Sequence, residues 1–402
     1  MIRVNISREM AWLESSNLKN CDIIIPSHIL AGLTKRITLM LTRLKRPYIV
    51  DPHTYIFGAD VEHIDDKRWF SKLVADYGLD VIITDPDNFE LLPNLLVDND
   101  TQPTDNLREL VENVINYQRT KIQETYDDIN EFEGFDENES DKNPSFKPKW
   151  IIPPYFFISA GRKDWLPVNI NSIKLAVENK NSNEKIFAVI MIDKEMLPYE
   201  KDIDEIVAEY NIDGVDGYMI WCAYMNENSA KEKELLHFQN FIKKLAIHKK
   251  PIHNMYGGLF SFLLEDKGMT GSSHSICYGE HRIPFSTGGG GMITRFYQPY
   301  LYSKVPLTRM EEIERALKLK KCDCKYCVIL KGVNTPGEEL ALTGKHFILK
   351  RINELKEINS KGIESFLKKL IDVNKSAMDN DKTGAYSNFY ERFSVWNQIL
   401  NK

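Results

Sequence analysis

Short apolar, β-branched runs recur along the chain and alternate with amphipathic stretches. Eight of these runs have the length and composition of buried strands, and they lie at residues 3–6, 22–25, 47–50, 155–158, 187–192, 217–221, 252–255 and 275–278. Between them, apolar positions recur at helical spacing, for example in residues 170–179 and 230–244. Strands that alternate with helices form parallel βαβ units, and eight such units close into a barrel. The pattern therefore predicts an α/β protein with a (β/α)8 TIM barrel, and an open doubly wound sheet is the alternative.

Two long stretches do not follow the barrel repeat. Residues 60–150 separate the third and fourth predicted strands, which is too long for a barrel connection. They include an amphipathic helix over 106–132 and a strongly acidic loop, and thus predict a helical and acidic insertion. The pattern again becomes helical near the C-terminus. The sequence therefore divides into a barrel of residues 1–59 and 151–300, the insertion, and a C-terminal helical subdomain of residues 301–402.

Composition limits the class of protein and its compartment. The chain has 402 residues, 43% of them hydrophobic, which suffices for one large domain or two ordinary ones. It has no run of 18 apolar residues, and its first residues lack the basic-then-apolar pattern of a signal peptide. Cys21, Cys222 and Cys277 are isolated, which argues against a disulfide framework. We therefore expect a cytoplasmic protein without a membrane segment.

The charge balance does not by itself indicate a partner. The chain has 52 Lys and Arg residues and 58 Asp and Glu residues, for a net charge of −6. This composition is not typical of a nucleic-acid-binding protein, but a local basic patch can lie on an acidic protein.

The densest group of metal-binding residue types is the run from Cys322 to Cys327. It holds three of the six cysteines at the spacing Cys-x-Cys-x-x-Cys, and the Asp, Lys and Tyr between them do not suit a buried apolar segment. His346 follows after 18 residues, at the predicted start of a helix. Three thiolates and one imidazole make a closed tetrahedral zinc site. The pattern therefore predicts one structural Zn²⁺ ion held by Cys322, Cys324, Cys327 and His346, and three incidental surface thiols are the alternative.

Three carboxylates follow the ends of predicted strands. Asp51 follows the third strand, Asp193 the fifth and Glu280 the eighth. In a barrel these strand ends form one rim, where catalytic groups lie. Two carboxylates beside an apolar slot suit cleavage of a glycosidic bond, because one can attack the anomeric carbon while the other moves the leaving-group proton. A single acid at such a position often caps a helix or forms a loop salt bridge. For Asp193 taken by itself we favour that interpretation, whereas three carboxylates together at strand ends favour a functional role.

Together these features resemble the tRNA-guanine transglycosylase superfamily. The Cys-x-Cys-x-x-Cys…His pattern is similar to its zinc signature, with a shorter gap to the histidine. Residues 46–55, Arg-Pro-Tyr-Ile-Val-Asp-Pro-His-Thr-Tyr, resemble its Arg-Pro…Thr-Asp-Ser-Gly-Gly-Tyr/Phe segment. Residues 216–218 resemble its Asp-Gly-Tyr, and Met255 with Gly257-Gly258 resembles its methionine–glycine turn.

The chain departs from that pattern at several positions, and there it resembles one branch of the superfamily. Pro52-His53 stands where Gly-Gly follows the family's acid–base aspartate, and Tyr278-Gly279-Glu280 stands where the family has Phe-Asp-Cys with the nucleophilic aspartate. A glycine-rich loop follows, and no tRNA-binding PUA domain is recognisable in the tail. These features resemble the DpdA-type DNA-guanine transglycosylases of phages and bacteria.

The resemblance implies exchange of guanine in DNA for a 7-deazaguanine base, with zinc in a structural role only. Guanine is flipped out of the stack and held between Tyr55 and Met255. Glu280 attacks C1′ and Asp51 carries the proton, or Asp51 is itself the nucleophile. Further substrate contacts are expected from Asp193, Gly257 and Gly258.

A DNA substrate also requires cations near the mouth of the barrel, because phosphate contacts position the strand. Cations follow the fourth and eighth predicted strands, and each could equally be an ordinary solvated charge. The candidates are Arg162, Lys163, His281, Arg282 and Arg295. A tRNA-guanine transglycosylase and a non-catalytic homologue that acts as a binding subunit are the alternative functions. The sequence leaves open whether a second copy of the chain or accessory modification proteins are partners.

Overall fold

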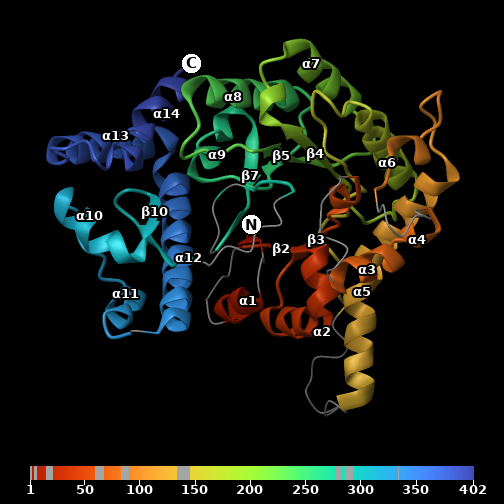
Figure 1. Cartoon of the computed structure of the whole chain (residues 1–402), viewed down its shortest axis with the longest axis horizontal. Helices are drawn as coiled ribbons and strands as arrows, with labels where there is room; N and C mark the ends of the chain where they lie inside the picture. The colour runs from red at the N-terminus through yellow and green to blue at the C-terminus, as the bar shows by residue number, and fades with distance from the viewer. Residues whose placement is uncertain are drawn as a thin grey trace.

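The computed structural model describes residues 2–3, 7–14, 21–58, 68–82, 90–133, 145–276, 280, 282–285, 293–333 and 335–402. Over these residues the chain is a mixed α/β protein, with parallel strands at the centre and helices around them (Figure 1). The α/β class predicted from the alternation of apolar runs and amphipathic stretches is confirmed.

One four-stranded sheet has the order β3-β2-β1-β8, and its strands are all parallel. The strands are β1 (Ile2–Arg3), β2 (Ile23–Pro26), β3 (Tyr48–Asp51) and β8 (His274–Ser275). Every residue of β2 and β3 is buried, as expected for strands covered on both faces. Residues 4–6, 277 and 278, which the sequence assigns to the first and last strands, lie outside the described residues.

A second parallel sheet has the order β4-β5-β6-β7. Its strands are β4 (Phe187–Asp193), β5 (Gly217–Ala223), β6 (Ile252–Asn254) and β7 (Met269–Ser272). The Phe187 ring covers the start of β5, where a Cβ at Gly217 would lie 2.3 Å from the ring. Glycine is therefore required where the two strands begin.

Two junctions connect the sheets. Only Ser273 separates β7 from β8, so one stretch of chain pairs with β6 in one sheet and with β1 in the other. On the opposite side, the extended segment 151–158 forms single parallel bridges to Ile186 and Ile192, at the two ends of β4. The described strands thus form two parallel sheets of four and one antiparallel pair, whereas the sequence predicts one closed sheet of eight.

Side-chain acceptors explain why the strand predicted at 155–158 forms bridges and not a ladder. The Tyr155 N–H donates to Thr54 Oγ1 at 2.7 Å, and the Phe156 N–H donates to Asn169 Oδ1 at 2.8 Å. Pro153 and Pro154 precede these residues and have no N–H to donate. Within the same segment, the backbone of Ile152 is paired with a side chain. Gln118 accepts from the Ile152 N–H at 3.0 Å and donates to its carbonyl at 2.7 Å.

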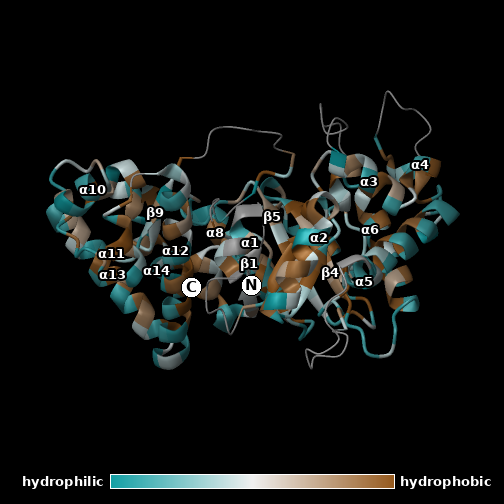
Figure 2. Ribbon diagram, turned by 90° about the horizontal axis from the view of Figure 1, so that it is seen from below, coloured by the Kyte–Doolittle hydropathy of each residue, from teal (hydrophilic) through white to brown (hydrophobic). Residues whose placement is uncertain are grey.

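Helices and short 3-10 turns connect and cover the strands. The helices of this part are α1 (Ser7–Glu14), α2 (Ser27–Leu44), α6 (Trp165–Glu178), α7 (Glu200–Glu209), α8 (Glu232–Ala246) and α9 (Leu259–Phe262). The 3-10 turns are η1 (Thr54–Gly58), η3 (Lys194–Met196) and η4 (Glu265–Lys267). Apolar residues concentrate on the central strands and hydrophilic residues on the outer helices (Figure 2). In the part of the chain that the structure describes, no helix has the length and apolarity needed to cross a membrane.

The stretch predicted as an insertion is helical where it is described. It contains α3 (Arg68–Asp76), α4 (Leu79–Ile82), η2 (Pro93–Leu95) and the long α5 (Asp105–Glu133). α5 packs against α2 and α6, and Gln118, on α5, makes the contact with Ile152. The helix therefore serves as support for the extended segment that lies between the two sheets.

The C-terminal part begins with an antiparallel pair, β9 (Arg295–Gln298) and β10 (Ser303–Pro306). It continues through η5 (Leu307–Arg309), α10 (Met310–Ala316), α11 (Lys325–Leu330), α12 (Pro336–Lys361), α13 (Ile363–Asn380), η6 (Ser387–Phe389) and α14 (Arg392–Leu400). These helices and the insertion helices lie at opposite ends of the molecule (Figure 1). α12 packs closely on the strand-bearing part, since a Cβ at Gly344 would lie 2.9 Å from the Trp12 ring and 3.0 Å from Ile276.

Candidate functional site

The three cysteines and the histidine predicted as metal ligands lie together. Cys324 is the N-cap residue of α11 and Cys327 lies within that helix, whereas His346 comes from α12. The ligand atoms of Cys322, Cys324, Cys327 and His346 all lie within 4.8 Å of one another. We call these four residues the Cys3His cluster. Their arrangement is compatible with a metal site.

The distances within the Cys3His cluster fit a tetrahedral metal ion. The sulfur atoms of Cys324 and Cys327 are 3.6 Å apart, and each lies 3.3 Å from His346 Nδ1. Four ligands held at about 2.0–2.3 Å from a tetrahedral ion are separated by roughly 3.3–3.8 Å. His346 Nε2 lies 2.7 Å from the Tyr297 carbonyl, to which it donates. This second contact fixes the tautomer, so Nδ1 presents its lone pair to the thiols, as in metal-bound histidines.

The pKa values of the three thiols are shifted in different directions. Burial raises the pKa of Cys322, but hydrogen bonds within the cluster and from Lys350 outweigh it, and this pKa lies below its usual value. The contact between Cys324 and Cys327 lowers the pKa of Cys324 and raises that of Cys327. Thiolates are the form of cysteine that binds metal.

Asp51 ends β3 and is fully buried. Its Oδ1 accepts from the Tyr155 hydroxyl at 2.7 Å and from the His53 backbone N–H at 3.3 Å. Its Oδ2 lies 3.1 Å from His53 Nε2. His53 Nδ1 in turn lies 2.9 Å from Nδ1 of His28, at the start of α2. Two hydrogen bonds thus orient the Asp51 carboxylate, and the His53 ring lies beside it.

Tyr55 follows in η1 and lies in an aromatic cluster. Its ring contacts Trp221 edge-on, with centroids 4.9 Å apart, and lies 5.8 Å from Tyr155 and 5.9 Å from Phe285. Arg282 borders the cluster, where its guanidinium lies 5.9 Å from the Trp221 ring. The predicted base-stacking residue is thus surrounded by aromatic side chains from several strand ends.

Glu280 belongs to a second buried network. Its Oε1 pairs with Arg351 of α12, and its Oε2 accepts from Asn228 Nδ2 at 2.8 Å. Arg351 also lies 3.5 Å from Glu354, one turn further along α12. The hydrogen bonds of Asp51 and those of Glu280 thus belong to separate networks, although both residues lie near strand ends.

Glu227 is a functional candidate that the sequence reasoning missed. It is buried and accepts from the backbone N–H groups of Gly258 and Ser261 at 2.8 and 3.1 Å. A Cβ at Gly258 would lie 2.7 Å from Glu280 Oε2 and 3.0 Å from Glu227 Oε2, so the two carboxylates flank this glycine. Burial raises the pKa of Glu227 to about 7, and the charge of Glu280 adds to the rise. Glu227 could have been found by its place, four residues after the end of β5.

The turn after β6 lies between the two networks. Tyr256 packs on Trp221 with centroids 4.5 Å apart and accepts from Arg282 at 3.0 Å, while Gly258 faces Glu280 and Glu227. Gly257 donates to the Ser273 carbonyl at 3.1 Å. Met255, predicted to stack on the base, is fully buried, and its N–H donates to Ile220 of β5.

Other predicted residues have local partners. Asp193 accepts from the Glu195 N–H at 2.9 Å and caps η3. This is the helix-cap role that the sequence favours when Asp193 is considered by itself. Arg162 pairs with Glu90 at 3.3 Å and Lys163 with Asp202 at 2.6 Å. Arg295 is exposed at the start of β9. His281 lies outside the described residues.

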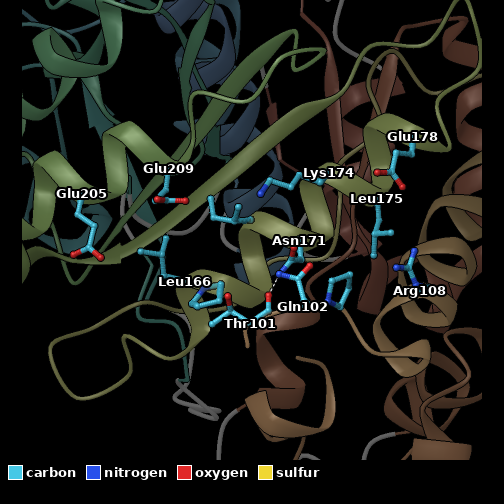
Figure 3. A pocket seen from close by; sticks show the side chains of 13 residues that line it. Thr101, Gln102, Arg108, Leu166, Asn171, Lys174, Leu175, Glu178, Glu205 and Glu209 are labelled. Atoms are coloured by element: carbon cyan, nitrogen blue, oxygen red, sulfur yellow. Dashed lines mark hydrogen bonds between the residues drawn. The ribbon is translucent and has the colours of Figure 1, made fainter. Parts of the chain in front are cut away.

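A separate cavity of about 440 Å³ lies between the start of α5 and helices α6 and α7 (Figure 3). Its wall carries two cations and three carboxylates, Arg108, Lys174, Glu178, Glu205 and Glu209. None of the predicted catalytic, base-binding or metal-binding residues lines it.

The fold and these groups define an α/β protein with a Cys3His cluster and two buried carboxylate networks near strand ends. Neither a scan against known protein-family profiles nor a search of curated proteins finds a match to this chain.

Proposed function

We propose that this protein is a transglycosylase that exchanges guanine in DNA for a 7-deazaguanine base. The observation that carries the proposal is the position of Asp51, a buried carboxylate at a strand end beside the aromatic cluster around Tyr55. A base removed from the duplex stack needs an aromatic surface and an acid–base group near its glycosidic bond. Trp221 adds a buried indole N–H that has no hydrogen-bond partner among the described residues. A bound base can accept from it.

The strand pairing supports a (β/α)8 barrel as the frame of this site. Segment 151–158 bridges to β4, and the Lys149 N–H next to it donates to the Tyr48 carbonyl of β3 at 2.7 Å. On the other side, β7 and β8 are nearly continuous and pair with β6 and β1. In our proposal the two sheets are halves of one closed sheet, and segment 151–158 supplies its remaining strand. Asp51 and Asp193 then lie on the same rim.

We further propose that the Cys3His cluster holds zinc. Three thiolates and one imidazole in a tetrahedral arrangement are typical of structural zinc sites, and the Tyr297 carbonyl supplies the outer contact that orients the histidine. A site with four protein ligands has no open position for substrate. The ion would therefore join α11 to α12 and take no part in the reaction.

The reaction uses two carboxylates. Glu280 attacks C1′ of the flipped deoxyguanosine, the C1′–N9 bond breaks, and guanine leaves with a proton delivered through Asp51. The incoming base then attacks C1′ through N9, the bond from C1′ to Glu280 breaks, and Asp51 receives the N9 proton. The ion pair with Arg351 holds the Glu280 carboxylate in place. In the alternative assignment Asp51 attacks C1′, and the hydrogen bonds from the Tyr155 hydroxyl and the His53 backbone N–H orient its carboxylate for the attack.

One observation favours a second function, that of a non-catalytic binding subunit. The buried pair between Glu280 and Arg351 gives the carboxylate a structural role that needs no reaction. In that case the aromatic cluster would serve only to pack the strand ends.

Release of labelled guanine from duplex DNA and from tRNA, at matched salt concentration, tests the proposal. We expect release from DNA that depends on an added 7-deazaguanine base. Asp51→Asn and Glu280→Gln should each lower the rate roughly 10²–10⁴-fold while the fold and metal content stay intact. A covalent adduct that persists in Glu280→Gln but not in Asp51→Asn would transfer the nucleophile role to Asp51. Faster release from tRNA would replace DNA as the substrate, and no release from either would favour the binding subunit.

A further inference from the structure

The buried carboxylate of Asp51 is the first member of a chain of three ionisable groups. His53 Nε2 lies 3.1 Å from Asp51 Oδ2, and His53 Nδ1 lies 2.9 Å from His28 Nδ1. Asp51 and His53 are 0% and 1% exposed, whereas His28 is only partly buried. The chain therefore leads from the interior of the site toward the surface. We call these three residues the histidine–aspartate chain.

The distances restrict where protons can lie in the histidine–aspartate chain. The 3.1 Å contact between His53 Nε2 and the Asp51 carboxylate is an ion pair when the His53 ring is protonated. In the tautomer in which His53 Nδ1 accepts from the Nδ1–H of His28, Nε2 of His53 carries a hydrogen and Nε2 is the basic nitrogen of His28. A proton that binds there can pass its charge along both rings and be held as an imidazolium beside Asp51.

The backbone at His53 adds an independent sign of function. His53 has φ = +56°, in the left-handed region where residues other than glycine are uncommon. The ring is nevertheless buried, stacks on His28 with centroids 4.6 Å apart, and packs edge-on against Tyr55 at 5.3 Å. A side chain that is kept at an unfavourable backbone position and ordered on two sides is typical of functional sites.

We propose that His28 and His53 form a proton relay that serves Asp51, so that the acid–base group of the site is the whole histidine–aspartate chain. The inference rests on the proposed base exchange. A buried carboxylate that gives up a proton needs a route by which it is protonated again, and His53 is the ionisable ring in contact with it. As guanine leaves, Asp51 passes it a proton taken from His53, and His53 is recharged through His28 from water. When the incoming base loses its N9 proton, the same path returns one proton to water, so that the cycle balances.

Other polar and charged groups face the histidine–aspartate chain and belong to the same titrating system. The Tyr155 hydroxyl donates to Asp51, and the Tyr55 ring contacts His53. The Arg282 guanidinium interacts with Asp51 through its charge, and burial together with the charge of Asp51 raises the pKa of the Tyr77 hydroxyl. On the α3 side the neighbour of His28 is Trp69, whose ring centroid lies 5.3 Å away and carries no charge.

Glutamine variants test the relay, because an amide can hydrogen-bond but cannot carry the proton. We expect His28→Gln and His53→Gln each to lower kcat for base exchange by about tenfold or more and to alter its pH profile, with KM for DNA unchanged. Added imidazole should partly restore the rate of His28→Ala. His237→Gln, which changes a histidine of α8 outside the chain, is the matched control and should behave as the wild type. An unchanged rate and pH profile in His28→Gln would overturn the relay.

A second measurement does not depend on catalysis. In NMR titrations of ¹⁵N-labelled imidazoles, we expect the signals of His28 and His53 to shift together, and Asp51→Asn to change both titrations but not that of His237. Independent titration of the two rings would overturn the relay even in an active enzyme. If the wild type exchanged no base on either nucleic acid, the proposed function would fail, and the NMR result would still decide whether the proton chain exists.

Discussion

Replacing Arg351 with methionine removes the cation that faces Glu280 in the interior. The two side chains are only 4% and 6% exposed, and a second carboxylate, Glu354, lies 3.5 Å from the same guanidinium. Methionine fills a similar volume but leaves the carboxylates without their counter-ion. Breaking a buried ion pair on one side costs about 3–5 kcal/mol. We therefore expect the free energy of unfolding to fall by that amount.

A double-mutant cycle tests the cause of this loss. In Glu280→Gln/Arg351→Met the buried charge is removed together with its partner, and we expect about 1–3 kcal/mol less destabilisation than the sum of the single variants. Urea unfolding followed by fluorescence measures each variant, and metal content is checked because α12 also carries His346. Arg309→Met is the matched control, since its pair with Glu312 is about half exposed and should matter little. A loss below about 1 kcal/mol in Arg351→Met, or additive single effects, would refute the reasoning.

Three further outcomes follow from the buried groups. The pKa of Glu227, raised by burial to about 7 from 4.5, means that the folded protein keeps a proton that the unfolded chain releases. The contribution of Glu227 to the free energy of unfolding is therefore fully present below pH 4.5 and is lost as the pH rises through 7. Urea unfolding across this range should show a smaller loss of stability in Glu227→Gln than in the wild type. Cys324→Ser should lose metal and unfold more easily than the wild type, and elemental analysis that finds less than about half a zinc per wild-type chain would contradict the site. Tyr155→Phe removes a hydrogen bond to a buried carboxylate and should cost about 1.5–3 kcal/mol, whereas Tyr48→Phe, which removes a buried hydroxyl without a partner among the described residues, should cost little.

The Cys3His cluster was the part of the site most open to sequence reasoning. Cys322, Cys324 and Cys327 are local in sequence, and their polar neighbours exclude a core role, so the spacing alone brings their sulfur atoms together. His346 was found because a fourth ligand was missing. The strand positions were equally accessible, since β2 to β6 are short, apolar runs whose pattern needs no tertiary information.

The buried networks were not accessible in this way. Glu280 could be placed after a strand, but its partner Arg351 lies 71 residues away on α12, and only the packing of that helix brings them together. In the sequence Glu227 looks like an ordinary loop acid. Only in the folded structure do the N–H groups of Gly258 and Ser261 donate to it. The strand at 155–158 was predicted from its apolar residues, yet the side chains of Thr54 and Asn169 accept from its first two N–H groups, which a ladder would need.

Helix α12 determines which parts of this protein can be grafted onto another protein without leaving a buried charge unpaired. It carries His346 on one turn and Arg351 five residues further, about 7.5 Å along its axis. A graft of residues 301–402 onto another protein would bring along the cation that pairs with Glu280, and a graft of the strand-bearing part alone would leave that acid buried and uncompensated. Gly344, which fits against Trp12, adds a steric condition at the same junction. The C-terminal region and residue 280 must therefore be exchanged together, although the chain between them looks like a natural boundary.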